Sequence, residues 1–213
     1  MVNELNRIHI DGKPMYVHYK LDTRTRIEHF FAQSVVECGT TLELQENFNY
    51  SIESLLNDNR FTKEQAEKYG YQKNNGIYIQ RANKIHIGRI KYNGRYGNMP
   101  NTDDGYNFSG KGLFHLTFRV NYRDFTIKAR EWGWIGEDID FEANPKLLFE
   151  DGNYALMSAT YFWKHNQCFA NANDNTKLCA DSITRIINRY TGSYQERWNQ
   201  YERIRNAEIF KEF

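Results

Sequence analysis

The sequence contains little cysteine, little proline and no long hydrophobic run. Three cysteines among 213 residues, without a CxxC pair, exclude a disulfide-rich scaffold. Three prolines and no Ser/Gly-rich linker mark no domain boundary, so we expect a single domain over residues 1–213. No stretch approaches the roughly 18 apolar residues that cross a bilayer, and membrane insertion is therefore not expected.

The charge balance and the missing motifs exclude further classes. Lys and Arg number 28 against 27 Asp and Glu, so the basic excess of a nucleic-acid-binding protein is absent. The six histidines show neither HExxH nor Cys/His zinc spacing, and GxGxxG, GxxxxGK[ST] and GxSxG do not occur. The sequence therefore predicts no cofactor, no metal and no nucleic-acid partner. The N-terminus, MVNELNRIHIDGK, lacks the apolar region of a signal peptide, so we expect synthesis in the cytoplasm.

Helical periodicity dominates the remaining pattern, which predicts a mainly α fold. Apolar and small residues recur at positions 27, 30, 31, 34, 35 and 38, which predicts an amphipathic helix from Arg24 that Gly39 ends. Further helices are predicted over 51–56, 62–69, 120–131, 153–165, 182–190 and 194–210, with a hairpin near 76–87. Residues 88–112 are rich in glycine and predict an irregular segment that lines a cleft.

Two glutamates stand out by position. Glu37 lies at the edge of the apolar stripe of the first long helix, where partial desolvation favours a protonated, proton-donating group. Glu46 follows nine residues later in LQENFNYS, where amides and hydroxyls favour a carboxylate. Two carboxyl groups in such different environments are typical of glycoside hydrolysis. Taken alone the pattern is a weak signal, and it favours two ordinary exposed or capping glutamates.

Five segments carry a resemblance to glycoside hydrolase family 19, in its compact bacterial and phage form. They are RIEHFFAQSVVECGT, LELQENFNYS, KYNGRYGN with DDGYNFSGKGLFHLTFRVNYRDF, YALMSATYFW and SITRIINRYTGSYQERWNQY. The match is collinear from about Arg24 to Arg205. It implies a lysozyme-like, two-lobed helical domain with a loop-lined substrate cleft and at most a small β-hairpin.

The resemblance also assigns roles to residues of this chain. It implies that Glu37 is the general acid and Glu46 the general base, and that Thr117 helps to hold the attacking water. It implies that Asn121, Tyr122 and Asn188 lie next to the substrate. It also implies that Arg197 lies in the substrate cleft and supports the catalytic glutamates. The family is inverting, which requires carboxyl groups about 6.5–9.5 Å apart.

Several positions depart from the family pattern. Val36 stands where the family has His before the acid, and Arg189 and Tyr190 replace glycines after the cleft asparagine. His115 stands where the family has Gln, and is expected to act as a hydrogen-bonding group of the cleft, with a structural or metal-ligand role as alternatives. Lys111, where the family tends to carry Arg, is either a cation of the groove or a solvated charge.

The favoured function is an inverting glycosidase that cuts β-1,4 bonds of an N-acetylated amino-sugar polymer. Peptidoglycan is preferred as substrate, as for an endolysin or lysozyme that reaches the cell wall after release or delivery, with an immunity or delivery partner left open. The alternatives are a chitinase and a non-catalytic glycan-binding protein. A thiol mechanism through Cys38 and His29 is disfavoured, because the helix places Cys38 on the apolar stripe.

Overall fold

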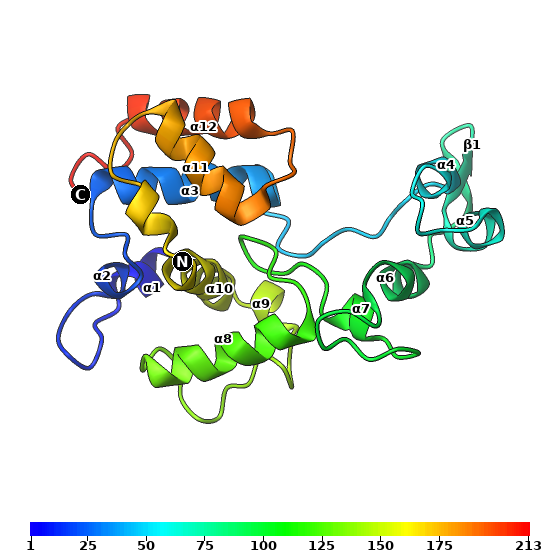
Figure 1. Cartoon of the computed structure of the whole chain (residues 1–213), viewed down its shortest axis with the longest axis horizontal. Helices are drawn as coiled ribbons and strands as arrows, with labels where there is room; N and C mark the ends of the chain where they lie inside the picture. Colours follow the sequence, from blue (N-terminus) through cyan, green and yellow to red (C-terminus); the bar gives the residue numbers. More distant parts are fainter.

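The chain is mainly helical, with one small hairpin, and both features confirm the prediction. The computed structural model describes all 213 residues and contains twelve α-helices, one 3₁₀-helix and one two-stranded antiparallel sheet (Figure 1). In chain order the elements are α1 (Val2–Asn6), α2 (Met15–His18), α3 (Arg24–Cys38), α4 (Ile52–Leu56), α5 (Lys63–Tyr69), β1 (Gln72–Asn74), β2 (Ile77–Gln80), α6 (Lys84–Tyr92), α7 (Asp104–Asn107), α8 (Arg119–Glu131), α9 (Leu147–Glu150), α10 (Gly152–His165), η1 (Cys168–Asn171), α11 (Lys177–Asn188) and α12 (Tyr194–Asn206). None of these helices has the length and apolar character needed to cross a membrane.

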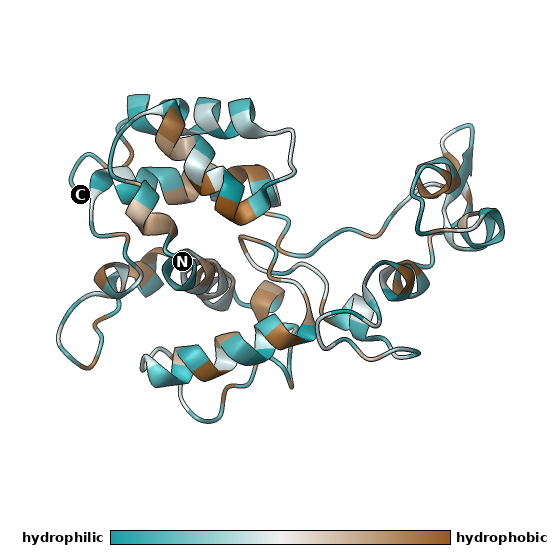
Figure 2. Cartoon of the chain, in the orientation of Figure 1, coloured by the Kyte–Doolittle hydropathy of each residue, from teal (hydrophilic) through white to brown (hydrophobic).

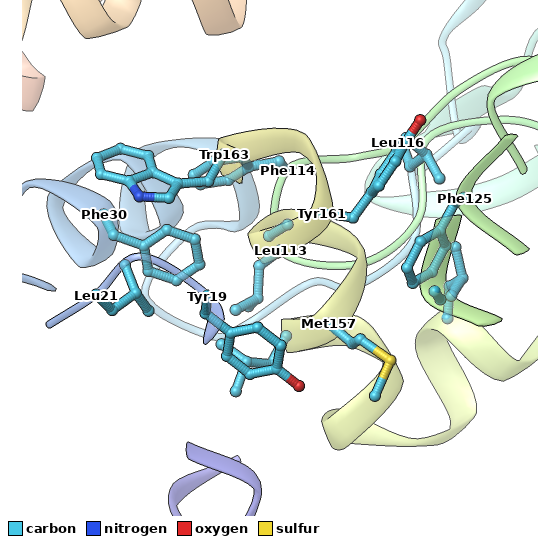
Figure 3. Close-up of a cluster of buried hydrophobic side chains, with 14 of the residues drawn as sticks. Tyr19, Leu21, Phe30, Leu113, Phe114, Leu116, Phe125, Met157, Tyr161 and Trp163 are labelled. Carbon is cyan, nitrogen blue, oxygen red and sulfur yellow. The ribbon is translucent and has the colours of Figure 1, made fainter. Parts of the chain in front are cut away.

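A large hydrophobic core holds together the N-terminal segment, α3, α8 and α10. Its buried side chains include Tyr19, Leu21, Phe30, Leu113, Phe125, Met157 and Trp163 (Figure 3). Helix α10 is central to this core, because eight of its fourteen residues are buried. A helix that is buried over most of its circumference needs apolar residues on all sides, as the segment YALMSATYFW provides.

A smaller lobe is built from α4, α5, the β1–β2 hairpin and α6 and has its own core. Five buried side chains form that core: Phe48, Leu55, Phe61, Ala66 and Ile87. The first turns of two of its helices are stabilised by capping residues. Ser51 caps α4, and Thr62 forms a capping box with Gln65 at the start of α5. Figure 1 shows this lobe at one end of the molecule, joined to α3 by the extended segment that follows Gly39.

The structure corrects the prediction between residues 72 and 112. The hairpin covers 72–80 and not 76–87, and residues 84–92 form helix α6. Asn83 caps this helix, and Ile87, Gly88 and Lys91 are buried together on one of its faces. Gly88 is required there, because a Cβ atom would lie 2.9 Å from the Cα of Tyr106. The predicted irregular segment therefore also contains α7, and α11 begins at Lys177, five residues before the predicted start.

Helix α12 packs along α3 and beside α11 (Figure 1). It is largely hydrophilic (Figure 2), yet it buries Arg197, Tyr201 and Ile204. A buried arginine requires polar partners, because an unpaired charge in a core is strongly unfavourable. Two of the three side-chain partners of Arg197, Gln33 and Glu37, come from the C-terminal half of α3, where the sequence predicted the general acid.

Candidate active site

Glu37 lies in the last turn of α3 and is held by Arg197. The guanidinium Nη2 of Arg197 donates to Glu37 Oε1 at 2.5 Å, and Glu37 Oε2 has no partner in the chain. The Arg197 side chain is 2% exposed and that of Glu37 13%. The carboxyl group is therefore fixed on one oxygen and keeps the other toward solvent. Arg197 thus contacts the predicted general acid, and its supporting role in catalysis stays a prediction.

Arg197 is itself positioned by two further hydrogen bonds. Its Nη1 donates to Gln33 Oε1 at 2.6 Å, and its Nε donates to Ser193 Oγ at 3.0 Å. The amide nitrogen of Gln33 in turn donates to Thr184 Oγ1 on α11 at 3.1 Å. Gln33 lies one helical turn before Glu37, so both side chains share one face of α3. Helices α3, α11 and α12 together orient one carboxylate.

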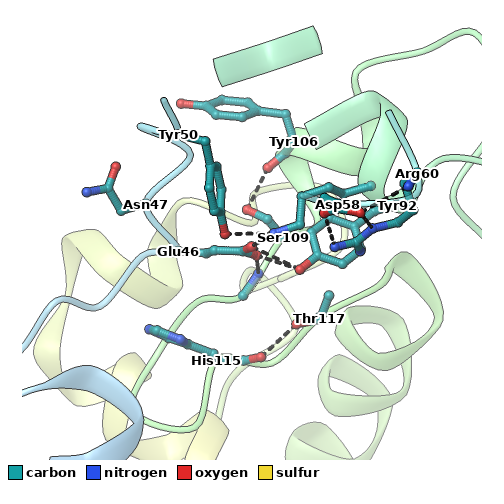
Figure 4. Close-up of polar contacts among 12 residues, drawn as sticks. Glu46, Asn47, Tyr50, Asp58, Arg60, Tyr92, Tyr106, Ser109, His115 and Thr117 are labelled. Atoms are coloured by element: carbon teal, nitrogen blue, oxygen red, sulfur yellow. Dashed lines mark hydrogen bonds and ion pairs between the residues drawn. The ribbon is translucent and has the colours of Figure 1, made fainter. Parts of the chain in front are cut away.

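Glu46 lies in the segment between α3 and α4 and has a different set of partners (Figure 4). Lys91 Nζ donates to Glu46 Oε1 at 2.8 Å, and the Tyr92 hydroxyl lies 2.9 Å from both carboxylate oxygens. The backbone N–H of Gly110 is a longer donor to Oε2, at 3.4 Å. The side chain of Glu46 is 17% exposed. The sequence predicted hydroxyl and amide groups around Glu46. The Tyr92 hydroxyl fits that prediction, whereas the ammonium group of Lys91 was not predicted. The side chains of Asn47 and Asn49 make hydrogen bonds with other residues and not with Glu46.

The pKa values of the two donors keep both of them protonated. Burial lowers the pKa of Lys91, but the charge of Glu46 and the hydrogen bonds with Glu46 and Tyr50 outweigh burial and raise it overall. Burial raises the pKa of Tyr92, and the charge of Glu46 raises it further. Lys91 is thus an ammonium and Tyr92 a phenol at neutral pH, and both donate hydrogen bonds to the carboxyl group of Glu46.

The segment that carries Glu46 is tied to the loop 110–116. The backbone N–H of Glu46 donates to the Gly110 carbonyl at 2.8 Å, and that of Gly112 donates to the Leu44 carbonyl at 2.9 Å. Gly112 has a φ of +77°, and a Cβ atom there would lie 2.1 Å from Ser158 Oγ on α10. Only glycine allows this approach, which fixes the loop, and with it Glu46, against the central helix.

Thr117 and His115 follow in a strained part of the same loop. His115 and Phe118 have φ values of +48° and +76°, and such conformations cost about 1–3 kcal/mol each in non-glycine residues. The Thr117 hydroxyl donates to the His115 carbonyl at 2.7 Å, and His115 Nε2 donates to the Glu43 carbonyl at 2.9 Å. Figure 4 shows Thr117 and His115 on one side of the Glu46 cluster. Backbone strain of this kind is typical of functional loops.

The remaining predicted residues divide between the surface and the core. Asn188 is exposed at the end of α11 and its side chain has no partner in the chain, whereas Asn121 donates to the Thr117 carbonyl at 2.7 Å. Tyr122 is fully buried, and its hydroxyl donates to the Ser109 carbonyl at 2.7 Å. The predicted contact of Tyr122 with substrate is therefore wrong for this structure, since the side chain supports the loop from inside.

Lys111 is a buried cation and not a solvated charge. Its Nζ donates to the Asn107 carbonyl at 2.7 Å and lies 3.2 Å from Ser109 Oγ. Burial lowers the pKa of Lys111 to about 8, an effect that the charge of Glu46 opposes. The side chain is 2% exposed and makes no ion pair with a carboxylate.

The thiol alternative is excluded by the surroundings of Cys38. Its Sγ donates to the Ser34 carbonyl, the residue is 2% exposed, and burial raises the pKa of the thiol to about 11. His29 stacks on Tyr201 and its Nε2 donates to the Asp174 carbonyl. The three cysteines are free.

Two pockets lie beside Glu46. One, of about 370 Å³, is lined by the segment 42–47 together with Lys84 and Phe149. The other, of about 300 Å³, is lined by Gln45, Tyr106, Asn107, Lys111, the segment 143–146 and Phe149. Glu37 lines neither pocket, and the networks of the two glutamates share no hydrogen bond. The predicted facing of the two carboxylates across one groove stays a prediction.

Sequence reasoning missed three residues of these networks. Gln33 lies in the segment RIEHFFAQSVVECGT, but the resemblance assigned it no function. Lys91 and Tyr92 lie in the segment 88–112, which was predicted to be irregular. The missed signal was the helical spacing of Ile87 and Lys91, which places Lys91 on the buried face of α6. Its ion pair with Glu46, 45 positions away, has no local signature.

Comparison with known proteins adds an independent observation. No family model matches the chain. The chain is 27% identical over 176 residues to a protein of Haemophilus influenzae named glycosyl hydrolase family 19 domain-containing protein, an alignment that covers 82% of this chain and 76% of that protein. The resemblance to glycoside hydrolase family 19 is confirmed by this distant relative. The relative's name states the family and no substrate.

Proposed function

We propose that the chain is an inverting glycoside hydrolase in which Glu37 is the general acid and Glu46 the general base. The observation that carries the proposal is that each glutamate at a family motif position is held by its own buried cation, Arg197 or Lys91, while the carboxyl group keeps partial exposure. A structural glutamate has no need of both features, whereas a reacting carboxyl group needs a fixed orientation and access to substrate.

The proposed reaction is a single displacement. Glu37 transfers a proton from Oε2 to the glycosidic oxygen as the bond between that oxygen and the anomeric carbon breaks. Glu46 accepts a proton from a water molecule, whose oxygen forms the new bond on the opposite face of the sugar. Lys91 donates to Oε1 alone at 2.8 Å, the Tyr92 hydroxyl lies 2.9 Å from both oxygens, and Gly110 is a longer donor to Oε2 at 3.4 Å. Oε2 therefore has the weaker donors and is the oxygen better able to accept that proton.

We propose peptidoglycan as the substrate, with chitin as the alternative. Lys146 and Lys111 line the pocket next to Gln45, and no carboxylate lines it. Lys146 is exposed, so its charge is available to a ligand. Peptidoglycan carries carboxyl groups on its lactyl and peptide substituents, whereas chitin is uncharged. A cationic wall beside the general base therefore favours the anionic polymer.

Two substrates and two substitutions test the proposed activity. Lysis of purified cell walls is followed by turbidity, and cleavage of a soluble chitin oligomer is followed by chromatography. We expect Glu37→Gln and Glu46→Gln each to abolish turnover while circular dichroism shows a folded chain. Full activity in either variant would overturn the roles of the two glutamates. Binding without turnover by the wild type would support a glycan-binding protein instead.

A third substitution ranks the two polymers. Lys146→Gln should lower the rate on cell walls and leave the rate on the chitin oligomer unchanged, because only the first substrate carries carboxylates. Lys211→Gln, an exposed lysine near the C-terminus, is the matched control and should change neither rate. Equal losses on both polymers would argue against a role of Lys146 in recognising charge.

A further inference from the structure

Three side chains near the N-terminus converge outside the site described above. His9 and Asp11 lie in the N-terminal loop, defined here as residues 8–14, and His18 ends α2. One ligand atom from each side chain lies within 4.8 Å of the other two, and no other group of three or more His, Cys, Asp or Glu side chains in the chain is this close. The separation H-x-D-x6-H matches no common zinc motif, which is why the sequence predicted no metal.

Both ring nitrogens of His9 lie close to oxygen atoms that can only accept a hydrogen bond. His9 Nε2 lies 3.0 Å from the Trp132 carbonyl, and Nδ1 lies 3.2 Å from Asp11 Oδ1. A neutral imidazole carries one N–H, so donation to the carbonyl leaves the Nδ1 lone pair directed at the carboxylate. His18 Nε2 lies 3.0 Å from the same Asp11 oxygen. A cation between these three atoms would resolve the conflict.

Protonation of both histidines would satisfy these contacts less well than a bound metal ion. The rings of His9 and His18 are 4.1 Å apart, so two protonated rings would repel each other at that distance. Asp11 Oδ1 also accepts the backbone N–H of Lys13 at 3.1 Å, which orients this carboxyl group within the loop. The cluster thus offers two nitrogen ligands and one carboxylate.

We propose that His9, Asp11 and His18 bind a divalent transition-metal ion of the zinc class. Zn–N and Zn–O bonds of about 2.0–2.2 Å in a tetrahedral site place neighbouring ligand atoms about 3.3–3.6 Å apart. The two separations that involve Asp11 Oδ1, 3.2 and 3.0 Å, need to widen by a few tenths of an ångström, and the third separation is within 4.8 Å. Two imidazoles and a carboxylate are ligands that zinc accepts, and a water molecule completes the four.

The surroundings of His9 support this assignment. The Trp132 carbonyl fixes the tautomer that presents Nδ1, as a second-layer partner does for metal-binding histidines. Gly133, with a φ of +66°, packs under the ring, since a Cβ atom there would lie 3.0 Å from His9 Nε2. The His9 side chain is 9% exposed, whereas Asp11 is 42% exposed, so an ion has access from solvent.

The bound ion would link three elements that are distant in sequence. It joins the N-terminal loop to α2 and, through the Trp132 carbonyl, to the C-terminal end of α8. Figure 1 shows this loop on the side of the molecule opposite the smaller lobe. The expected role is structural, because the site lies far from the residues that the proposed reaction uses.

Calorimetric titration of the untagged, chelator-treated chain with zinc chloride tests the proposal. We expect one zinc ion per chain, with affinity at least about tenfold lower in His18→Gln and in Asp11→Asn. His86→Gln is the matched control, because His86 lies in the smaller lobe and bonds Asn83, and it should bind zinc like the wild type. Absence of binding by the wild type, or equal affinity in the wild type and His18→Gln, would overturn the site.

Thermal unfolding provides a second measurement that is independent of glycosidase activity. Zinc should raise the unfolding midpoint of the wild type and of His86→Gln, because an ion that binds only the folded chain stabilises it. The midpoint of His18→Gln should not respond to zinc. This comparison needs only His18→Gln, which decides the outcome even if Asp11→Asn does not fold. An equal shift in all three chains would contradict binding at this cluster.

Discussion

Substitution of Arg197 by methionine tests how much the contacts of its guanidinium group contribute to the stability of the chain. Methionine keeps much of the volume of the arginine stem and removes the guanidinium. Three hydrogen bonds disappear, to Glu37, Gln33 and Ser193. Glu37 then loses its one side-chain partner at 13% exposure, and Gln33 Oε1 keeps only the long contact with Thr184 at 3.4 Å.

The expected cost follows from the burial of this pair. Removing one partner of a buried ion pair lowers the free energy of unfolding by about 3–5 kcal/mol. For a chain of this length, 1 kcal/mol corresponds to about 2–4 °C in the unfolding midpoint, so a decrease of about 6–20 °C is expected. Arg203→Met is the control on the same helix, because Arg203 is exposed and has no side-chain partner. Its effect should stay within about 0.5 kcal/mol.

Thermal and urea unfolding of four chains measure these values: wild type, Arg197→Met, Glu37→Gln and the double variant. The double variant lacks both members of the Arg197–Glu37 contact, so its loss of stability should be less than the sum of the two single losses by about 0.5–3 kcal/mol. A loss below about 1 kcal/mol in Arg197→Met, or strictly additive effects, would refute the reasoning that Arg197 holds Glu37 through a buried ion pair.

Three further predictions concern the loop and the pocket of Glu46. Lys91→Met should reduce turnover at least about tenfold with little change in substrate binding, because Glu46 loses its cation; equal losses in both would indicate a general disturbance. Burial lowers the pKa of Lys111 to about 8 from an ordinary value near 10.5, so between pH 8 and 10.5 the unfolded chain binds the additional proton and stability rises with pH. Urea unfolding should show this rise, at most about 1.4 kcal/mol per pH unit, weakened in Lys111→Met, and an identical slope would contradict it. Gly112→Ala should lower the free energy of unfolding more than Gly76→Ala does. Both glycines have a positive φ, but only a Cβ atom at position 112 would clash, with Ser158 Oγ. Similar losses in urea unfolding would show that the loop can shift to accept the Cβ atom.

The helices with complete local signals were predictable from the sequence. The apolar stripe from Arg24 and the terminating Gly39 gave α3 its observed bounds, and Thr62 marked the start of α5. The first residues of α6 were predicted to belong to the hairpin, because Ile85 and Ile87 alternate with polar residues, and the rest of α6 was predicted to be irregular. The cap by Asn83 and the burial of Lys91 decide for a helix, and the second of these depends on tertiary packing.

The candidate site was predictable only in part. The motif positions of Glu37 and Glu46 came from the family resemblance, and the structure adds the cation that holds each of them. Tyr122 was misplaced because a motif gives a residue's position along the chain but not the direction of its side chain. The convergence of His9, Asp11 and His18 depends on the path of the N-terminal loop and on a carbonyl from α8. No spacing rule contains that information.

The configuration of the first product tests the roles of Glu37 and Glu46 most directly. Proton NMR of a soluble β-1,4-linked N-acetylated oligosaccharide, recorded within the first minutes of hydrolysis, distinguishes the two anomers before they equilibrate. A single displacement by water predicts the α-anomer first, with no product from Glu37→Gln or Glu46→Gln. Initial release of the β-anomer by the wild type would contradict an acid and base pair acting on a water molecule.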